Sequence, residues 1–322
     1  MLRRWVPWGG KLVLSGVLIG YLLHEIDGAM VWQRLLTIET GALAWALLLI
    51  IGQVVIGALR WREVLEALGT GLPAVQVVRI VYIAIFFNLV LPGTVGGDAV
   101  RMWKARQAGL GVAEAIDSVI LERVATVLGL LLLAGVTAPL LSHRIDDTTV
   151  LYVFPALALA GVAGTGVMLG LDRLLPLGDG WGRRSLARLA HDARAVFLRG
   201  RPAVSVLLYS IIGHINLAGV VFMLAQGLVL EATFLDCVLL VPPVILLLTL
   251  PISIAGWGVR EQAMITAFGF IGVSAENALA LSILFGLVTM AGAVPGGVLW
   301  LAAGKEEKHP REEQVPPHAP HA

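Results

Sequence analysis

Arginine and small polar residues recur in two copies of one stretch of the chain. Residues 91–101 read Leu-Pro-Gly-Thr-Val-Gly-Gly-Asp-Ala-Val-Arg, and residues 250–260 read Leu-Pro-Ile-Ser-Ile-Ala-Gly-Trp-Gly-Val-Arg. Each copy interrupts an apolar run with Pro and Gly and then ends on an arginine, Arg101 or Arg260. A guanidinium offers a planar fork of N–H donors that matches a phosphate. The two copies predict a pair of related anion sites, and chance similarity between two membrane loops is the alternative.

A short helix is expected to begin after each interruption, with its first N–H groups and the positive end of its dipole favouring an anion. Asp98 lies three residues before Arg101, so these two could instead form a local ion pair that only stabilises the turn. The candidate substrate-binding residues of the two copies are Asn88, Thr94, Gly96, Gly97, Asp98, Arg101, Ser253, Gly256, Arg260 and Glu261.

Three further candidates for substrate contact are Glu122, Arg123 and His214, which lie in other apolar runs. An unpaired charge at the bilayer centre costs about 2.5–3.5 kcal/mol on insertion scales, so we expect Glu122 and Arg123 to be paired and near the cytoplasmic interface. His214 and Asn216 lie deep inside their run, where they either pack against a neighbouring helix or line a cavity. Gln53 has the same two interpretations.

The composition determines which elements must position these residues. The chain of 322 residues is 58% hydrophobic and 14% charged, and its mean hydropathy is +0.87. Such a composition is typical of a polytopic membrane protein. The single cysteine, Cys237, excludes an intramolecular disulfide.

The hydropathy pattern predicts an all-α protein of about six transmembrane helices and two re-entrant helical hairpins in an inverted repeat. A single integral membrane domain is expected over residues 1–304, with repeat halves at about 1–141 and 149–304. Residues 305–322 are expected to form a disordered cytoplasmic tail. Gly292 and Gly296 form a small-xxx-small pair typical of helix packing. The predicted spans are Trp5–Leu23, Gly41–Leu59, Ser118–Leu140, Val150–Leu171, Ala203–Val229 and Ala278–Ala303.

The distribution of positive charge favours this topology. The apolar part of the first broken segment, Ile80–Leu91, would reach only about 18 Å as a helix, against a hydrocarbon core of about 30 Å. If both broken segments are re-entrant, 20 of the 23 basic residues lie on the cytoplasmic side, together with both termini. Arg34, Arg144 and Arg260 lie on the other side. Treating either segment as one or two spans moves a strongly basic interval outside.

A basic segment connects the two halves. Between Asp172 and Arg201, apolar residues recur at helical spacing against five arginines. This pattern predicts an interfacial amphipathic helix whose apolar face meets lipid and whose arginines meet lipid phosphates. The apolar residues are Leu186, Leu189, Ala190, Ala193, Val196 and Phe197, and the arginines are Arg183, Arg184, Arg188, Arg194 and Arg199.

No enzyme motif is present: the sequence has no P-loop, no spaced His/Glu zinc set and no supported Ser/His/Asp cluster. We therefore expect no catalytic residue, no metal, no cofactor and no nucleic-acid partner. A membrane lipid bearing a phosphate is the expected substrate. A homodimer and an association with an envelope-biosynthesis enzyme remain open.

The chain resembles the lysylphosphatidylglycerol synthase transmembrane-region family at Leu59–Trp61, Asn88–Arg101, Leu121–Val124 and Gly256–Glu261. This flippase-like domain occurs at the N-terminus of the multiple peptide resistance factor and as stand-alone membrane proteins. The resemblance covers about Leu12–Ala303 and implies a prokaryotic cytoplasmic-membrane protein that moves a phospholipid or polyprenyl-linked lipid between leaflets. Because the chain ends some twenty residues after its last span, lipid aminoacylation is not expected of it.

The sequence thus predicts a lipid flippase for an anionic phospholipid or a polyprenyl-phosphate-linked lipid. A non-transporting membrane subunit of a cell-envelope glycosyltransferase or lipid-modifying system is the alternative. A membrane-embedded lipid-modifying enzyme is the third class, for which only Glu122 and His214 are candidate catalytic groups. A water-accessible cavity between the hairpins would favour the flippase, and a dry packed core would favour the subunit.

Overall fold

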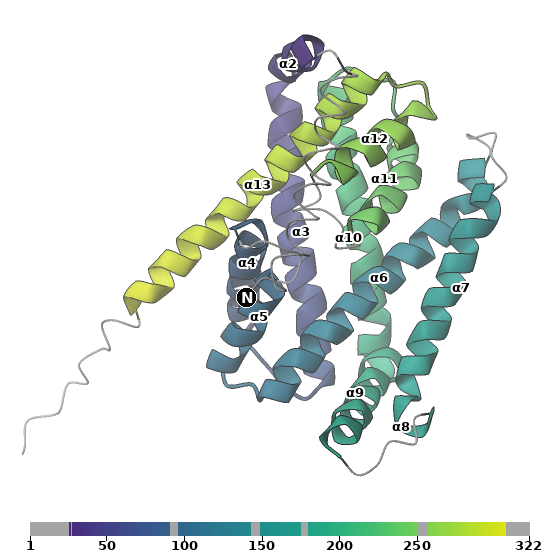
Figure 1. Ribbon diagram of the computed structural model, residues 1–322. Coiled ribbons are helices and arrows are strands. Elements are labelled where there is room, and N and C mark those ends of the chain that lie inside the picture. Colours follow the sequence, from purple (N-terminus) through teal and green to yellow (C-terminus); the bar gives the residue numbers. More distant parts are fainter. Residues whose placement is uncertain are drawn as a thin grey trace, which may run out of the picture.

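The computed structural model describes residue 26 and residues 28–90, 96–142, 149–174, 180–249 and 257–306. In this part of the chain the protein is helical, as predicted (Figure 1). The helices are α2 Gly28–Leu36, α3 Thr40–Ala67, α4 Ala74–Val90, α5 Gly96–Gln107, α6 Val112–Ser142, α7 Thr149–Leu169, α8 Leu171–Leu174, α9 Trp181–Leu198, α10 Gly200–Gly227, α11 Phe234–Thr249, α12 Val259–Gly269 and α13 Ala275–Glu306.

Five of these helices are long and apolar enough to cross a membrane. They contain the segments Thr40–Ala67, Val112–Leu140, Tyr152–Leu169, Gly200–Gly227 and Ala275–Ala302. About 20 apolar residues suffice to cross the hydrocarbon core as a helix. The chain is therefore a polytopic all-α membrane protein, and five of the six predicted spans are confirmed.

Some of the predicted features lie outside the described residues. These are the first span at 5–23, most of the tail at 307–322, and the tips of the two broken segments at 91–95 and 250–256. The candidates Thr94, Ser253 and Gly256 belong to those tips. Helix α13 continues to Glu306, two residues past the predicted end of the membrane domain.

The four helices α3–α6 recur in the same order as α10–α13, and the turns between them recur as well. After α3, the Thr70 N–H donates to the Leu65 carbonyl at 2.9 Å, and after α10 the Leu230 N–H donates to the Ala225 carbonyl at 2.9 Å. Both turns pass through a left-handed residue, Gly69 in one and Val229 in the other. Because that conformation is costly for a β-branched residue, its occurrence at Val229 indicates that the repeated fold requires this turn.

The two repeats run in opposite directions. The Glu39 N–H before α3 donates to the carbonyl of Gly227 at the end of α10, at 3.1 Å. At the other end, the Ser205 hydroxyl near the start of α10 donates to Glu63 near the end of α3, at 2.6 Å. Helices α3 and α10 are therefore antiparallel neighbours at the centre of the bundle (Figure 1).

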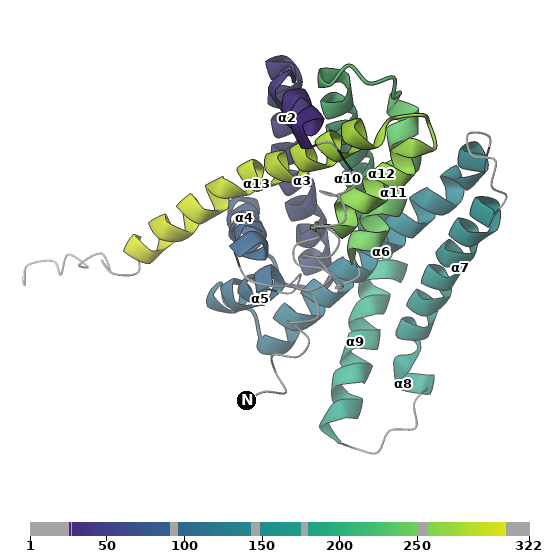
Figure 2. The ribbon, with the colours of Figure 1, turned by 45° about the horizontal axis from the view of Figure 1, so that its top comes forward.

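Each pair of short helices packs against the long helix of the other half: α4 against α13, and α11 against α6. Figure 2 shows α13 crossing α3 and α4. A Cβ on Gly292 would collide with Ile50 of α3, and one on Gly296 would collide with the Tyr82 carbonyl of α4. The two glycines therefore allow close helix packing, as the sequence predicted.

Both ends of the α4–α5 pair lie at one end of the bundle. One hydrophobic cluster joins Trp61 and Leu65 near the end of α3, Val77 near the start of α4, Ala105 near the end of α5, and Ala115 near the start of α6. The pair therefore enters and returns at the same end. The α11–α12 pair does the same, because Leu228, Cys237, Phe268 and Ala278 belong to a second cluster.

Helix α9 does not offer its apolar face to lipid, so that prediction is wrong. Ala193 and Val196 are fully buried in a cluster with Val64, Leu121 and Val206 of α3, α6 and α10. The apolar face of α9 fills the space where these three helices meet. The helical spacing of its apolar residues is the same whether that face packs against protein or against lipid.

Arg188 and Arg194 of α9 bind carboxylates of the protein. Arg188 Nε lies 2.6 Å from Asp117 Oδ2, and Arg194 makes a bidentate pair with Asp172 at 2.9 and 3.0 Å. These contacts hold α9 against α6 and α8. They also make these two side chains parts of the fold instead of free phosphate ligands.

Candidate anion-binding site

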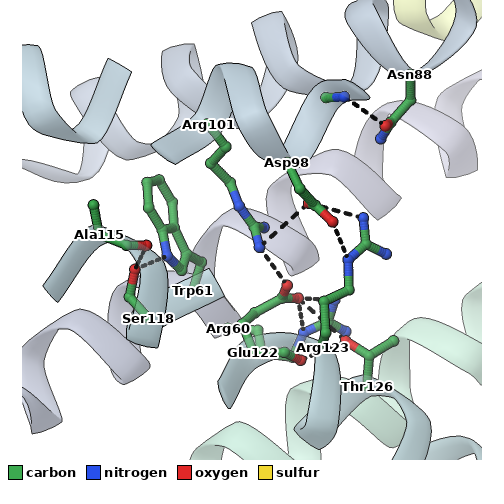
Figure 3. A network of polar contacts seen from close by, with 11 residues as sticks. Arg60, Trp61, Asn88, Asp98, Arg101, Ala115, Ser118, Glu122, Arg123 and Thr126 are labelled. Atoms are coloured by element: carbon green, nitrogen blue, oxygen red, sulfur yellow. Dashed lines mark hydrogen bonds and ion pairs between the residues drawn. The ribbon is translucent and has the colours of Figure 1, made fainter. Parts of the chain in front are cut away.

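The first site begins where α4 and α5 meet. The Asn88 side-chain oxygen accepts a hydrogen bond from the Gly97 N–H at 2.9 Å (Figure 3). A Cβ on Gly97 would collide with the Ala84 carbonyl and would lie 2.5 Å from Asn88 Oδ1. Gly97 thus lets the start of α5 approach α4, and Asn88 and Gly97 position the hairpin. Gly96, the first residue of α5, is half-buried beside them.

Glu122 of α6 holds two arginines from different helices. Its carboxylate accepts from Arg60 Nε of α3 at 2.7 Å and from Arg60 Nη2. It also accepts from Arg101 Nη2 of α5 at 2.9 Å. All three residues are buried, with 8%, 6% and 2% of the surface of Arg60, Arg101 and Glu122 exposed. The carboxylate therefore ties the hairpin to both long helices (Figure 3).

Asp98 pairs mainly with α6 and only weakly within its own helix. Arg123 donates through Nε and Nη2 to the two Asp98 oxygens at 2.9 and 3.0 Å. The Arg101–Asp98 distance is 3.6 Å. The predicted local pair thus exists, but stronger contacts across helices surround it. The expectation that Glu122 and Arg123 are paired is confirmed, each with a different partner.

Trp61 lies under the Arg101 guanidinium, with 5.1 Å between the guanidinium carbon and the ring centre. Its indole N–H donates to the Ser118 hydroxyl at 3.3 Å, and its surface is fully buried. The pair Arg60–Trp61 near the end of α3 is therefore buried inside the protein. An aromatic face stabilises a nearby guanidinium and fixes where Arg101 lies.

The first site carries one positive charge in excess, from three guanidiniums and two carboxylates. The members are Arg60, Arg101, Arg123, Glu122 and Asp98. The Arg101 Nε donor is buried and has no hydrogen-bond partner among the described residues, and a buried donor without a partner is costly. The side chain of Arg123 is 48% exposed. The site therefore has both a free donor and an accessible cation for an incoming anion.

His214 of α10 lies at the edge of this site. Its Nε2 is 3.0 Å from the Thr126 carbonyl, and the Thr126 hydroxyl lies 3.2 Å from Glu122 Oε1. The other ring nitrogen, Nδ1, is buried and has no hydrogen-bond partner in the part of the chain that the structure describes. Asn216 instead donates to Gln53 and to the Leu49 carbonyl, both at 2.9 Å. Of the two interpretations of Asn216 and Gln53, helix packing is confirmed.

The second hairpin holds its arginine differently. Arg260 donates to Glu261 Oε1 through Nε at 3.1 Å and through Nη2 at 2.6 Å, and its Nε lies 3.3 Å from the Ser282 hydroxyl of α13. Glu261 Oε2 accepts from the Gly258 N–H at 2.6 Å. The guanidinium carbon is 4.7 Å from the centre of the Trp257 ring. This second site is electrically neutral.

Glycine at position 286 makes room for the second arginine, since a Cβ there would lie 2.6 Å from Arg260 Nη1. Each site thus combines a hairpin arginine, a tryptophan and a polar residue of the following long helix. No hydrogen bond or ion pair joins the two sites within the described residues. They lie in opposite halves of the inverted repeat, on α5 and α12 (Figure 1).

The chain matches the family described as the lysylphosphatidylglycerol synthase TM region over residues 9–297, most of its length. It belongs to this family. The suspected family is therefore confirmed, and with it a membrane domain linked to lipid handling. No curated protein matches the chain. Within this family member, the quoted segments around Trp61, Arg101 and Glu122 meet in one place, although they are far apart in the sequence.

Sequence reasoning missed several members of the two sites. Arg60, Trp61, Ser118, Thr126, Trp257 and Ser282 were not among the candidates. Two signals could have indicated the first pair: Arg60 and Trp61 lie in a segment that carries the family resemblance, and Glu122 needed a cationic partner inside the membrane.

Proposed function

We propose that this protein is a lipid flippase of the prokaryotic cytoplasmic membrane. Its substrate is an anionic phospholipid or a polyprenyl-phosphate-linked lipid. The observation that carries the proposal is the positive excess of the first site, built on a hairpin inside a polytopic membrane protein. A buried cation in a transmembrane region marks a substrate or ion pathway by default.

The other contacts of Glu122 lower the free-energy cost of replacing it at Arg101 by a phosphate. When a phosphate takes the Arg101 fork, Glu122 keeps both contacts to Arg60 and the Thr126 hydroxyl. No carboxylate is left buried and alone, which would otherwise cost several kcal/mol. The free Nε of Arg101 supplies the second donor of a bidentate phosphate contact. Arg101 can therefore bind and release a phosphate without unfolding the site.

The inverted repeat supplies a related position on the other side of the membrane. Both hairpins are proposed to be re-entrant, with α5 and α12 reached from opposite faces and both termini in the cytoplasm. Arg260 would meet the phosphate after Arg101 does. Because Glu261 neutralises Arg260, the second site would hold an anion less tightly than the first. Transfer of the lipid phosphate from the tighter first site to the weaker second site would favour release of the lipid on one side of the membrane.

Cysteine labelling tests this topology. In a Cys237→Ser background, Gln107→Cys at the end of α5 and Ser274→Cys before α13 place exposed thiols at the two ends of the bundle. An impermeant maleimide applied to intact cells should label Ser274→Cys, and Gln107→Cys should react only after the cells are opened. Labelling of both from outside would contradict the inverted topology.

A non-transporting membrane subunit of an envelope glycosyltransferase or lipid-modifying system is the second candidate. The observation that favours it is the pairing of both carboxylates of the first site with arginines, which a purely structural charge cluster would also show. A catalytic role for the chain is not proposed. Purified protein in vesicles distinguishes the two functions: a flippase moves a labelled anionic lipid between leaflets faster than empty vesicles, and a subunit gives the empty-vesicle rate.

A further inference from the structure

A groove between α6 and α7 has a cation at one end and apolar walls along its length. Its volume is about 310 Å³, at the lower end of the roughly 300–1,000 Å³ of small-molecule sites. The lining residues are Arg123, Val124, Val127, Leu128, Leu131, Gly161, Gly164, Thr165 and Met168.

The order of these residues matches the order of groups in a lipid. Along α6 the groove starts at Arg123 and ends at Leu131, a rise of about 12 Å at 1.5 Å per residue. Helix α7 runs the opposite way, because a Cβ on Gly161 would lie 2.6 Å from Leu131 Cδ1, and one on Gly135, further along α6, would lie 2.8 Å from the Cβ of the earlier residue Ala158. Arg123 lies toward the start of α6, and the apolar end of the groove lies toward the middle of that span. A phosphate at Arg123 would therefore have its acyl chain directed into the bilayer.

Arg123 has donors to spare for such a phosphate. Its Nε and Nη2 atoms bind Asp98, and a guanidinium carries five N–H donors in all. Its side chain is 48% exposed, whereas that of Arg101 is 7% exposed. Arg123 is thus the member of the positively charged site that a lipid beside the protein reaches first.

We propose that the α6–α7 groove binds an anionic phospholipid of the surrounding bilayer, with one acyl chain along the groove and the phosphate on Arg123. Asp98 contacts both Arg123 and Arg101, so the bound phosphate lies one carboxylate away from the hairpin arginine. The groove is then the place where lipid is collected before Arg101. That role rests on the proposed function, whereas binding itself is measured without transport.

Two glycines of α7 give a matched test. An added Cβ meets nothing within 4 Å at Gly164, which lines the groove, or at Gly166, which does not. Gly164→Leu should fill the groove, and Gly166→Leu adds the same side chain elsewhere on the same helix. The probe is a phosphatidylglycerol with a diazirine in its acyl chain, crosslinked to the protein in phosphatidylcholine vesicles and mapped by mass spectrometry.

Wild type and Gly166→Leu should be labelled within Val127–Leu131 and Thr165–Met168, and Gly164→Leu should lose at least fivefold of that labelling. A phosphatidylcholine carrying the same diazirine chain should label the groove at least fivefold less than phosphatidylglycerol, and Arg123→Gln should remove that difference. Equal labelling of Gly164→Leu and wild type would overturn the site. Equal labelling by the two lipids in wild type would overturn the role of Arg123, even if Arg123→Gln fails to fold. Failure of flipping with labelling intact would count against the transport proposal alone.

Discussion

Replacing Glu122 by glutamine tests whether the first site is one interacting network. The change keeps the side-chain shape but removes the charge that two buried arginines share. The side chains of Glu122, Arg60 and Arg101 are 3%, 10% and 7% exposed. Removing one partner of a buried ion pair costs about 3–5 kcal/mol. The glutamine oxygen can still accept from one arginine, so the lower end, about 3 kcal/mol, is expected.

A loss of 1 kcal/mol lowers the melting temperature of a larger domain by roughly 2 °C, so the melting temperature of Glu122→Gln should fall by about 6 °C. The melting temperature is measured on purified protein by intrinsic tryptophan fluorescence. The control is Glu66→Gln, which removes a half-exposed i,i+4 pair with Arg62 at 2.9 Å and should cost no more than about 0.5 kcal/mol. A Glu122→Gln protein that melts with wild type, or with the Glu66 variant, would refute the reasoning.

Two further changes probe the fold around the site and beside α9. Gly97→Ala should lower the free energy of unfolding by about 1–3 kcal/mol, because the added Cβ must displace the Ala84 carbonyl or Asn88. The control is Gly57→Ala, whose added Cβ meets nothing within 4 Å. Equal melting temperatures for the two variants would contradict the close approach of α5 to α4 at Gly97. The hydrogen bond from Arg194 lowers the pKa of Asp172 below its ordinary 3.8, so the stabilisation is present above that value and is lost as pH falls through the lowered pKa. Asp172→Asn should therefore melt below wild type at pH 6 and converge with it in strong acid, and a pH-independent gap would contradict this.

The repeat could be predicted from sequence because Pro and Gly interrupt two apolar runs at matching places. The hydropathy pattern also predicted the five spans that the structure describes and the two pairs of short helices. It could not predict Arg60 as a partner of Glu122, which is 62 residues away. An arginine followed by tryptophan near the end of a span is typical of an interfacial anchor. Only the packing of α5 and α6 against the end of α3 buries both residues.

The apolar stripe of α9 illustrates a second limit. Its periodicity shows that one face avoids water, and lipid and protein satisfy that requirement equally well. The packing of α3, α6 and α10 determines that this face contacts protein, because Ala193 and Val196 pack where these three helices meet. The two hairpin arginines show a third limit. The repeat relates Arg101 to Arg260, but the adjacent Glu261 neutralises only the second of them.

The central claim is that Arg101 is the principal anion contact, and leaflet-resolved flipping of a labelled anionic lipid in vesicles tests it most directly. Wild type, Arg101→Lys and Arg101→Ala are compared with Arg106→Ala, which removes an exposed arginine of the same helix. Lysine keeps a charge but not the bidentate fork. The account predicts wild-type flipping for Arg106→Ala, a large loss for Arg101→Lys and almost complete loss for Arg101→Ala. Flipping at the wild-type rate by folded Arg101→Ala would contradict it.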